Sequence, residues 1–190
     1  MAKPRRINLK NGKEILLRHI ERSDVDCIWD NFNQVVEEGK YLPTFEKVVT
    51  EYEKSSWWRD LRLMDNLCLV AVDEKLKESK NVIGQVTLED IQWEASEHVA
   101  VLGIIIRKKY RNQGLGNELI KYSLVEAEKK GKEKVILSVF ATNESAIHLY
   151  KNLGFEVVGI RKKHFYMDHR YIDEVLMEIW VANGQLSFLE

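Results

Sequence analysis

The chain has 190 residues, 45% of them hydrophobic and 31% charged, so we expect one hydrophobic core and a single domain over residues 1–190. The 29 basic and 30 acidic residues leave a net charge of −1, which excludes a general attraction to nucleic acid or an anionic membrane, and neither partner is expected. Cys27 and Cys68 lack metal-ligand spacing, and no apolar run approaches the roughly 20 residues of a membrane span, so we expect a cytoplasmic protein without a metal.

The first 91 residues alternate between apolar patterns typical of strands and of helices. Val25, Ile28, Trp29 and Phe32 recur with helical spacing after the candidate N-cap Ser23. We expect a strand over 14–20 that follows the Asn11-Gly12 turn, a helix over 24–38, one or two helices over 45–63, and strands over 67–73 and 82–91 with a possible bulge at Gly84.

A short apolar run, from Val99 to Ile106, lies near the centre of the chain, and basic residues 107–109 end it. Its continuous apolar character predicts a strand that is buried on both faces. From Leu115 onward, apolar residues recur at three- and four-residue spacing, and Gly131 suits the left-handed residue that ends a helix. This stretch therefore predicts a strand, a basic turn and a helix of about four turns.

The turn between this strand and this helix, Arg111-Asn112-Gln113-Gly114-Leu115-Gly116, has the features of an anion-binding site. Its glycines let another group approach the main chain, the first N–H groups of the helix have no partner within it, and Arg111 adds a cation. Alternatively, the glycines only turn the chain. The turn is not a Walker A loop, which needs Gly-Lys-Ser/Thr, nor a dinucleotide fingerprint, because Leu119 stands where the third glycine belongs.

A second informative block has the sequence ATNESAIHLYKNLGFEVVG, residues 141–159. It predicts the end of a strand over 135–143 and a helix over 144–153 that ends at Gly154. The glycine turn resembles the acyl-CoA-binding signature Arg/Gln-x-x-Gly-x-Gly/Ala of the GNAT family of acetyltransferases, at Arg111, Gly114 and Gly116. The second block resembles the same family's pattern of an asparagine, a tyrosine and a glycine-aromatic pair, here Asn143, Tyr150 and Gly154-Phe155.

The resemblance implies the α/β fold of the GNAT family: a mixed, mostly antiparallel sheet of seven strands with helices on both faces and splayed fourth and fifth strands. After the second block we expect a strand over 157–160, a charged loop over 161–170 and a last strand over 171–181. In the family, the co-substrate acetyl-CoA lies between the splayed strands. The residues that match its binding positions are Ile104, Ile105, Ile106, Arg111, Asn112, Gln113, Gly114, Leu115, Gly116, Asn117, Asn143 and Tyr150.

The resemblance also implies candidate catalytic residues. Tyr150 occupies the position from which the family often protonates the departing thiolate, although a tyrosine on this apolar helix face is also a common core residue. The positions at which family members carry a general base are Ala100 and Ser138 here, and neither side chain can serve. The remaining candidate bases are Glu89, His98, Glu37 and Glu38, and the last two, with Tyr41, are candidate acceptor-binding residues; each is also a plausible surface residue.

We therefore expect an acetyl-CoA-dependent N-acetyltransferase, in which a small-molecule or peptide primary amine attacks the thioester directly in a ternary complex. A polyamine, a protein N-terminus and an amino-acid-like acceptor remain open, since the acidic residues favour a cationic amine, whereas Arg18 or Arg107 could bind a carboxylate. The apolar and aromatic stretch 171–189 predicts a homodimer. The alternatives are a non-catalytic acyl-CoA sensor or regulatory protein, and an interaction protein that kept only the fold.

Overall fold

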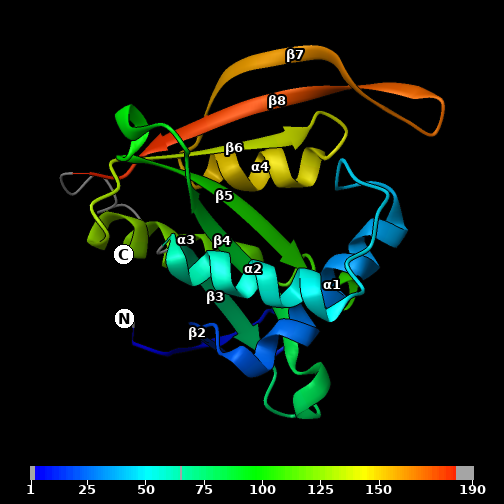
Figure 1. Cartoon of the computed structure of the whole chain (residues 1–190), viewed down its shortest axis with the longest axis vertical. Coiled ribbons are helices and arrows are strands. Elements are labelled where there is room, and N and C mark those ends of the chain that lie inside the picture. Colours follow the sequence, from blue (N-terminus) through cyan, green and yellow to red (C-terminus); the bar gives the residue numbers. More distant parts are fainter. Residues whose placement is uncertain (1–2, 65, 183–190) are drawn as a thin grey trace.

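The structure, a computed structural model, describes residues 3–64 and 66–182 and contains a mixed sheet with helices on both faces (Figure 1). Within these residues the sheet has eight strands in the order β1-β2-β3-β4-β5-β6-β8-β7. All neighbouring strands are antiparallel except β5 and β6. The strands are β1 (Arg5–Asn8), β2 (Glu14–His19), β3 (Leu67–Val72), β4 (Val82–Asp90), β5 (Val99–Ile106), β6 (Lys134–Phe140), β7 (Glu156–Met167) and β8 (Arg170–Trp180). The main helices are α1 (Val25–Glu38), α2 (Glu51–Leu63), α3 (Leu115–Lys129) and α4 (Glu144–Asn152).

The expected α/β class and the mixed, mostly antiparallel sheet are confirmed, with one strand more than the seven expected. The additional strand is β1, which pairs with β2 across the Asn11-Gly12 turn and places Arg5 opposite Leu17. A register shift between β3 and β4 lies beside Gly84, where the sequence suggested a bulge. None of the described helices is both long enough and apolar enough to span a membrane.

The helix expected over 45–63 is shorter in the structure. Its start at Glu51 is fixed by a capping box, in which Thr50 Oγ1 accepts the Glu53 N–H at 3.2 Å and the Glu53 carboxylate accepts the Thr50 N–H at 3.0 Å. Residues 45–50 have no regular secondary structure. The apolar residues Val48 and Val49 continue the helical spacing but precede the cap, so periodicity alone placed the helix start too early.

The charged loop expected over 161–170 is wrong as well, because β7 continues to Met167. The chain turns at Asp168 and His169, whose φ values of 47° and 60° are those of a tight hairpin, and returns as β8. The pairing of the two strands is irregular between Arg161 and Phe165. β7 is the last strand of the sheet and is largely exposed, so it lacks the apolar alternation by which strands are usually recognised.

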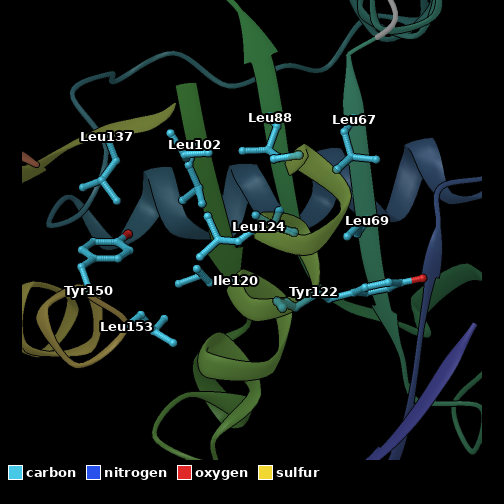
Figure 2. Packing of buried hydrophobic residues seen from close by; sticks show 14 of the residues in the cluster. Leu67, Leu69, Leu88, Leu102, Ile120, Tyr122, Leu124, Leu137, Tyr150 and Leu153 are labelled. Atoms are coloured by element: carbon cyan, nitrogen blue, oxygen red, sulfur yellow. The ribbon is translucent and has the colours of Figure 1, made fainter. Parts of the chain in front are cut away.

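Hydrophobic cores lie on both faces of the sheet. The larger core packs α3 and α4 against the central strands, and Figure 2 shows Ile120 and Leu124 of α3 beside Leu102 of β5 and Leu88 of β4. The smaller core joins α1 and α2 to the other face through side chains that include Ile28 and Leu61. The larger core therefore supports the central strands on the α3 side, and the smaller core covers β3 and β4 on the α1 side.

The sheet opens between β5 and β6. Residues 99–101 pair with residues 134–136, and beyond them the two strands diverge (Figure 1). The expected splaying of the two central strands is thus confirmed. The expectation that the strand is buried on both faces is wrong from Val101 onward. Val101 and Gly103 are exposed, because the helices on the α1 side do not cover this part of β5.

Candidate active site

A cavity of about 1100 Å³ occupies the place where β5 and β6 diverge. One wall is made by residues 102–106 of β5 and by the turn that leads into α3. The opposite wall is made by residues 138–140 of β6 and by α4. Residues 41–43, in the connection between α1 and α2, close a further side. The cavity thus brings together both sequence blocks that carry the family resemblance.

The turn before α3 forms a cradle of main-chain N–H groups, residues 112–117, at one end of the cavity. Asn112 and Gly114 have left-handed φ values of 59° and 90°, and no backbone carbonyl of the described residues accepts a hydrogen bond from these six N–H groups. A Cβ on Gly116 would lie 3.0 Å from Leu149 and 3.3 Å from Ile106. Gly114 therefore allows the turn, and Gly116 allows α3, α4 and β5 to approach one another closely. The N–H groups of the cradle remain available to bind an anion.

β5 presents a free main-chain edge to the cavity. The Arg107 N–H donates to the Ile83 carbonyl oxygen at 2.9 Å, and Ile105 stands opposite Gln85 on β4. Because antiparallel hydrogen bonding alternates along a strand, the main-chain groups of Ile104 and Ile106 point away from β4 and toward the gap. β6 pairs with β5 only over residues 99–101, so no described strand covers this edge, although the Ile106 carbonyl oxygen accepts a hydrogen bond from Arg111.

The Arg111 side chain joins three elements beside the cavity. Its Nε donates to the Ile106 carbonyl oxygen at 2.8 Å, and its Nη1 donates to Glu38 Oε2 at 2.7 Å, with a second bond from Nη2 to the same carboxylate. The guanidinium also lies over the Tyr41 ring, 4.8 Å from its centroid. These hydrogen bonds from Arg111 lower the pKa of Glu38. The cation that the sequence offers to a phosphate is thus already paired with a carboxylate.

Tyr150 and Asn143 come from the two ends of α4. Tyr150 is 6% exposed and lines the cavity, and no described residue hydrogen-bonds to its hydroxyl. Figure 2 shows its ring beside Leu102 of β5 and Leu137 of β6. Burial raises the pKa of Tyr150 to about 12. Asn143 also lines the cavity and caps α4, since its Oδ1 accepts the Ala146 N–H at 3.4 Å.

Comparison with known proteins agrees with this geometry. Residues 35–155, more than half of the chain, match the model of the family described as Acetyltransferase (GNAT) family. The chain belongs to the GNAT family. The L-amino acid N-acetyltransferase AaaT of Escherichia coli (strain K12) is 26% identical over 166 residues, which are 86% of this chain and 96% of that protein.

A shorter stretch of 86 residues, 45% of this chain, is 31% identical to the ribosomal protein bS18-alanine N-acetyltransferase of the same organism and covers 58% of it. Among solved structures, the phosphinothricin acetyltransferase of Sinorhizobium meliloti in complex with acetyl-CoA matches with a TM-score of 0.80 and 22% identity, over 89% of each chain. The family match and the named relatives make this chain an N-acetyltransferase.

The candidate bases of this GNAT chain lie at separate places. Glu89 is on the α1 side of β4, because its neighbour Leu88 belongs to the larger core on the opposite face. It does not line the cavity, and desolvation raises its pKa. His98 is exposed and precedes β5, at the end of that strand far from Ile106. Glu37 is exposed and paired with Lys47 at 2.5 Å.

The cations suggested for an acceptor carboxylate are engaged elsewhere. Arg18 donates to both carboxylate oxygens of Asp24, at 2.7 and 2.9 Å. Arg107 donates to the Asn31 side chain and, at 2.6 Å, to the Lys80 carbonyl oxygen. Neither arginine lines the cavity. The structure therefore gathers Tyr41 and Glu38 next to the cradle and leaves the other acceptor candidates apart from it.

Sequence reasoning missed an aromatic wall of the cavity. The rings of Phe140 and Phe165 lie 4.9 Å apart, and both residues line the cavity together with Leu42 and Pro43. The charged neighbours of Phe165 predict a loop, and nothing local in the sequence indicates that its ring packs on Phe140 of β6. Leu42 and Pro43 lie in a connection whose path depends on the packing of α1 and α2.

An anchor beneath the cradle was missed too. The Tyr110 hydroxyl donates to Asp73 Oδ2 at 2.8 Å in a buried site, and Lys13 Nζ lies 3.3 Å from the same oxygen. The Lys10 N–H donates to the Gln113 carbonyl oxygen at 3.1 Å. These contacts tie the cradle to the end of β3 and to the first hairpin. The partners come from distant parts of the sequence, so no spacing rule reveals them.

Proposed function

We propose that this N-acetyltransferase transfers the acetyl group of acetyl-CoA to a primary amine by direct attack in a ternary complex. The observation that carries the proposal is that the N–H cradle and the free edge of β5 adjoin in one cavity. At the positive end of α3, six main-chain N–H groups donate to no backbone carbonyl of the described residues, and such a group of donors suits a pyrophosphate. The residues present therefore fit the co-substrate.

Each part of the cavity has a role in binding. The N–H groups of residues 112–117 would hold the pyrophosphate. The main-chain groups of Ile104 and the N–H of Ile106 would hold the pantetheine arm, with Asn143 as a further polar contact. When bound, acetyl-CoA supplies an activated thioester, whose C–S bond breaks as the amine forms the new C–N bond. A main-chain N–H of β5 near Ile106 would donate a hydrogen bond to the carbonyl oxygen as negative charge develops there.

Two side chains would move protons. A phenol with a pKa of about 12 stays protonated near neutral pH, so Tyr150 can donate its proton to the departing thiolate. Glu89 would accept the amine proton through water, and its raised pKa brings it nearer to that task. We prefer Glu89 to His98 because Glu89 lies opposite Val101, beside the opening of the sheet, whereas His98 precedes the strand.

The relatives suggest the kind of amine. Their printed names describe acetylation of L-amino acids and of the alanine of a ribosomal protein, so we propose an α-amino group on a small molecule or a peptide as the acceptor. We also propose that the protein is cytoplasmic and forms a homodimer. Residues 183–189 of the stretch that predicts the dimer lie outside the described residues, but the edge strand β7 exposes Val158, Ile160 and Tyr166 to a partner. Sedimentation at micromolar concentration should give the dimer mass, and a monomer mass would reject this arrangement.

Incubation with acetyl-CoA and a panel of amines tests the reaction. Thiol release together with an acetylated amine in the mass spectrum is the expected result. Tight acetyl-CoA binding in calorimetry without turnover on any amine would instead support a non-catalytic acyl-CoA sensor. Absence of acetyl-CoA binding would contradict both functions and leave an interaction protein that kept the fold.

A further inference from the structure

We infer that the acceptor is a primary monoamine with an apolar or aromatic substituent and that polyamines are poor acceptors; this inference rests on the proposed acetyl transfer. It comes from the wall of the cavity that faces the α1 side of the sheet. We call this surface the acceptor wall, and it consists of Tyr41, Leu42, Pro43, Ser138, Phe140 and Phe165.

The position of the acceptor wall follows from strand geometry. Along β6, Leu137 and Val139 belong to the larger core with α3 and α4, so Ser138 and Phe140 point to the opposite face. Phe165 of β7 packs on Phe140 there. The cradle and Tyr150 come from α3 and α4. A molecule that approaches the thioester from the α1 side, away from the cradle and Tyr150, therefore meets this wall.

None of the side chains of the acceptor wall carries a charge, and its polar groups are the hydroxyls of Tyr41 and Ser138. Among the described residues that line the cavity, the acidic and basic side chains are Lys10, Arg111, Glu118 and His148. These come from the first hairpin, the start of the glycine turn, α3 and α4. The acceptor wall is thus apolar, whereas ionic groups gather where the phosphates of the co-substrate are proposed to lie.

The carboxylates closest to the acceptor wall are already paired with cations of the chain, whereas Glu118 lines the cavity from the first turn of α3, on the side of the cradle. Glu38 is held by Arg111, and Glu37 is paired with Lys47 at the surface. Glu174, which stands opposite Phe140 on β8, is buried and lies 2.8 Å from Arg161 and 3.5 Å from His164. Glu89 is the proposed acceptor of the single proton that the reacting amine must lose.

A second ammonium on the acceptor would therefore lose water at the acceptor wall without gaining a carboxylate, which is unfavourable. An apolar or aromatic substituent would instead bury its surface against Leu42, Phe140 and Phe165, which is favourable. Glu37 and Glu38, which favour a polyamine acceptor when the sequence is considered alone, are paired with Lys47 and Arg111 in the folded protein. The acceptor wall thus selects for one positive charge and an apolar group beside it.

Matched amines test this inference on the wild-type protein. Pentylamine and 1,5-diaminopentane share a carbon chain and differ in the second ammonium, and phenylalaninamide and lysinamide differ in the side chain next to one α-amine. We expect kcat/KM to favour pentylamine and phenylalaninamide by roughly tenfold or more, the scale on which apolar pockets discriminate. Equal or better turnover of 1,5-diaminopentane or lysinamide would overturn the inference.

Ser138 offers a test by gain of function, because it is exposed in the cavity and lies on the acceptor wall. Ser138→Asp should raise the ratio of diamine to monoamine turnover by about tenfold, whereas the uncharged Ser138→Asn should leave it unchanged. An unchanged ratio in Ser138→Asp would overturn the inference. Acetyl-CoA affinity, measured by calorimetry, should stay constant in both variants. If the wild type binds no acetyl-CoA, the proposed function fails together with this inference. If it binds acetyl-CoA but prefers diamines to monoamines, only this inference is overturned.

Discussion

Arg111 and Glu38, which lie 73 residues apart in the sequence, form a doubly hydrogen-bonded ion pair beside the cavity. The pair joins the first residue of the glycine turn to the last residue of α1. Because the same guanidinium lies over Tyr41, one side chain links the cradle to the acceptor wall. Arg111 therefore organises two walls of the cavity, in addition to any contact it makes with a bound anion.

Glu38→Gln should lower the free energy of unfolding by about 1–3 kcal/mol near pH 7, because the partly buried Arg111 loses its charged partner. The pKa of Glu38 lies below its usual 4.5 in the folded protein. The stabilisation that ionised Glu38 gives the folded state is therefore fully present above pH 4.5 and is lost as the pH falls through the lowered pKa. Urea unfolding at several pH values should show the difference between wild type and variant shrinking in acid. Glu37→Gln, at an exposed pair, is the control, and a difference that does not change with pH would reject the role of this ion pair.

Tyr150→Phe keeps the ring and removes only the hydroxyl. If the phenol protonates the thiolate, kcat should fall by roughly a hundredfold, within the usual range for general-acid catalysis. The affinity for acetyl-CoA and the melting temperature should hardly change, because no described residue depends on this hydroxyl for a hydrogen bond. Steady-state kinetics and calorimetry measure the two effects separately. Unchanged kcat in a folded variant would make Tyr150 a core residue.

Glu89→Gln tests the proposed base. In the wild type, kcat/KM should fall as the pH drops through the raised pKa of Glu89, since the protonated carboxyl cannot accept a proton. The variant should lose roughly a hundredfold in kcat/KM and show no such acid limb. Asp90→Asn removes the adjacent carboxylate, which is paired with Lys132, and should leave the pH profile unchanged. An acid limb that persists in Glu89→Gln would assign the base to another group.

Tyr110→Phe tests the anchor beneath the cradle. Buried Asp73 would lose the hydrogen bond from the Tyr110 hydroxyl, so unfolding should become easier by about 1–3 kcal/mol. The KM for acetyl-CoA should rise more than the KM for the amine, because Tyr110 immediately precedes the glycine turn. Tyr52→Phe, at an exposed tyrosine, serves as the control. Equal changes in both KM values would mean that the anchor does not act on the cradle.

The sequence predicted those parts of the protein whose signals are local. The strand from Val99 to Ile106 and the helix that follows Gly114 were found because apolar spacing and glycines act over a few residues. The ion pair of Arg111 and the hydrogen bond of Tyr110 join residues that only the folded sheet brings together. The end of β7 was missed because an exposed edge strand can carry charges where a buried strand carries apolar residues.

The central claim is that acetyl-CoA binds at the cradle, and calorimetric titration of Gly114→Asp with acetyl-CoA tests it most directly. An aspartate there would place a negative charge at the N–H groups proposed to bind pyrophosphate. Gly131→Asp is the matched control. Both glycines have a left-handed φ, 78° for Gly131 and 90° for Gly114, and both have open space around them. Gly131, however, lies at the far end of α3. We predict tight binding in the wild type and in Gly131→Asp, and a loss of at least a hundredfold in Gly114→Asp. Unchanged affinity in a folded Gly114→Asp protein would contradict the claim.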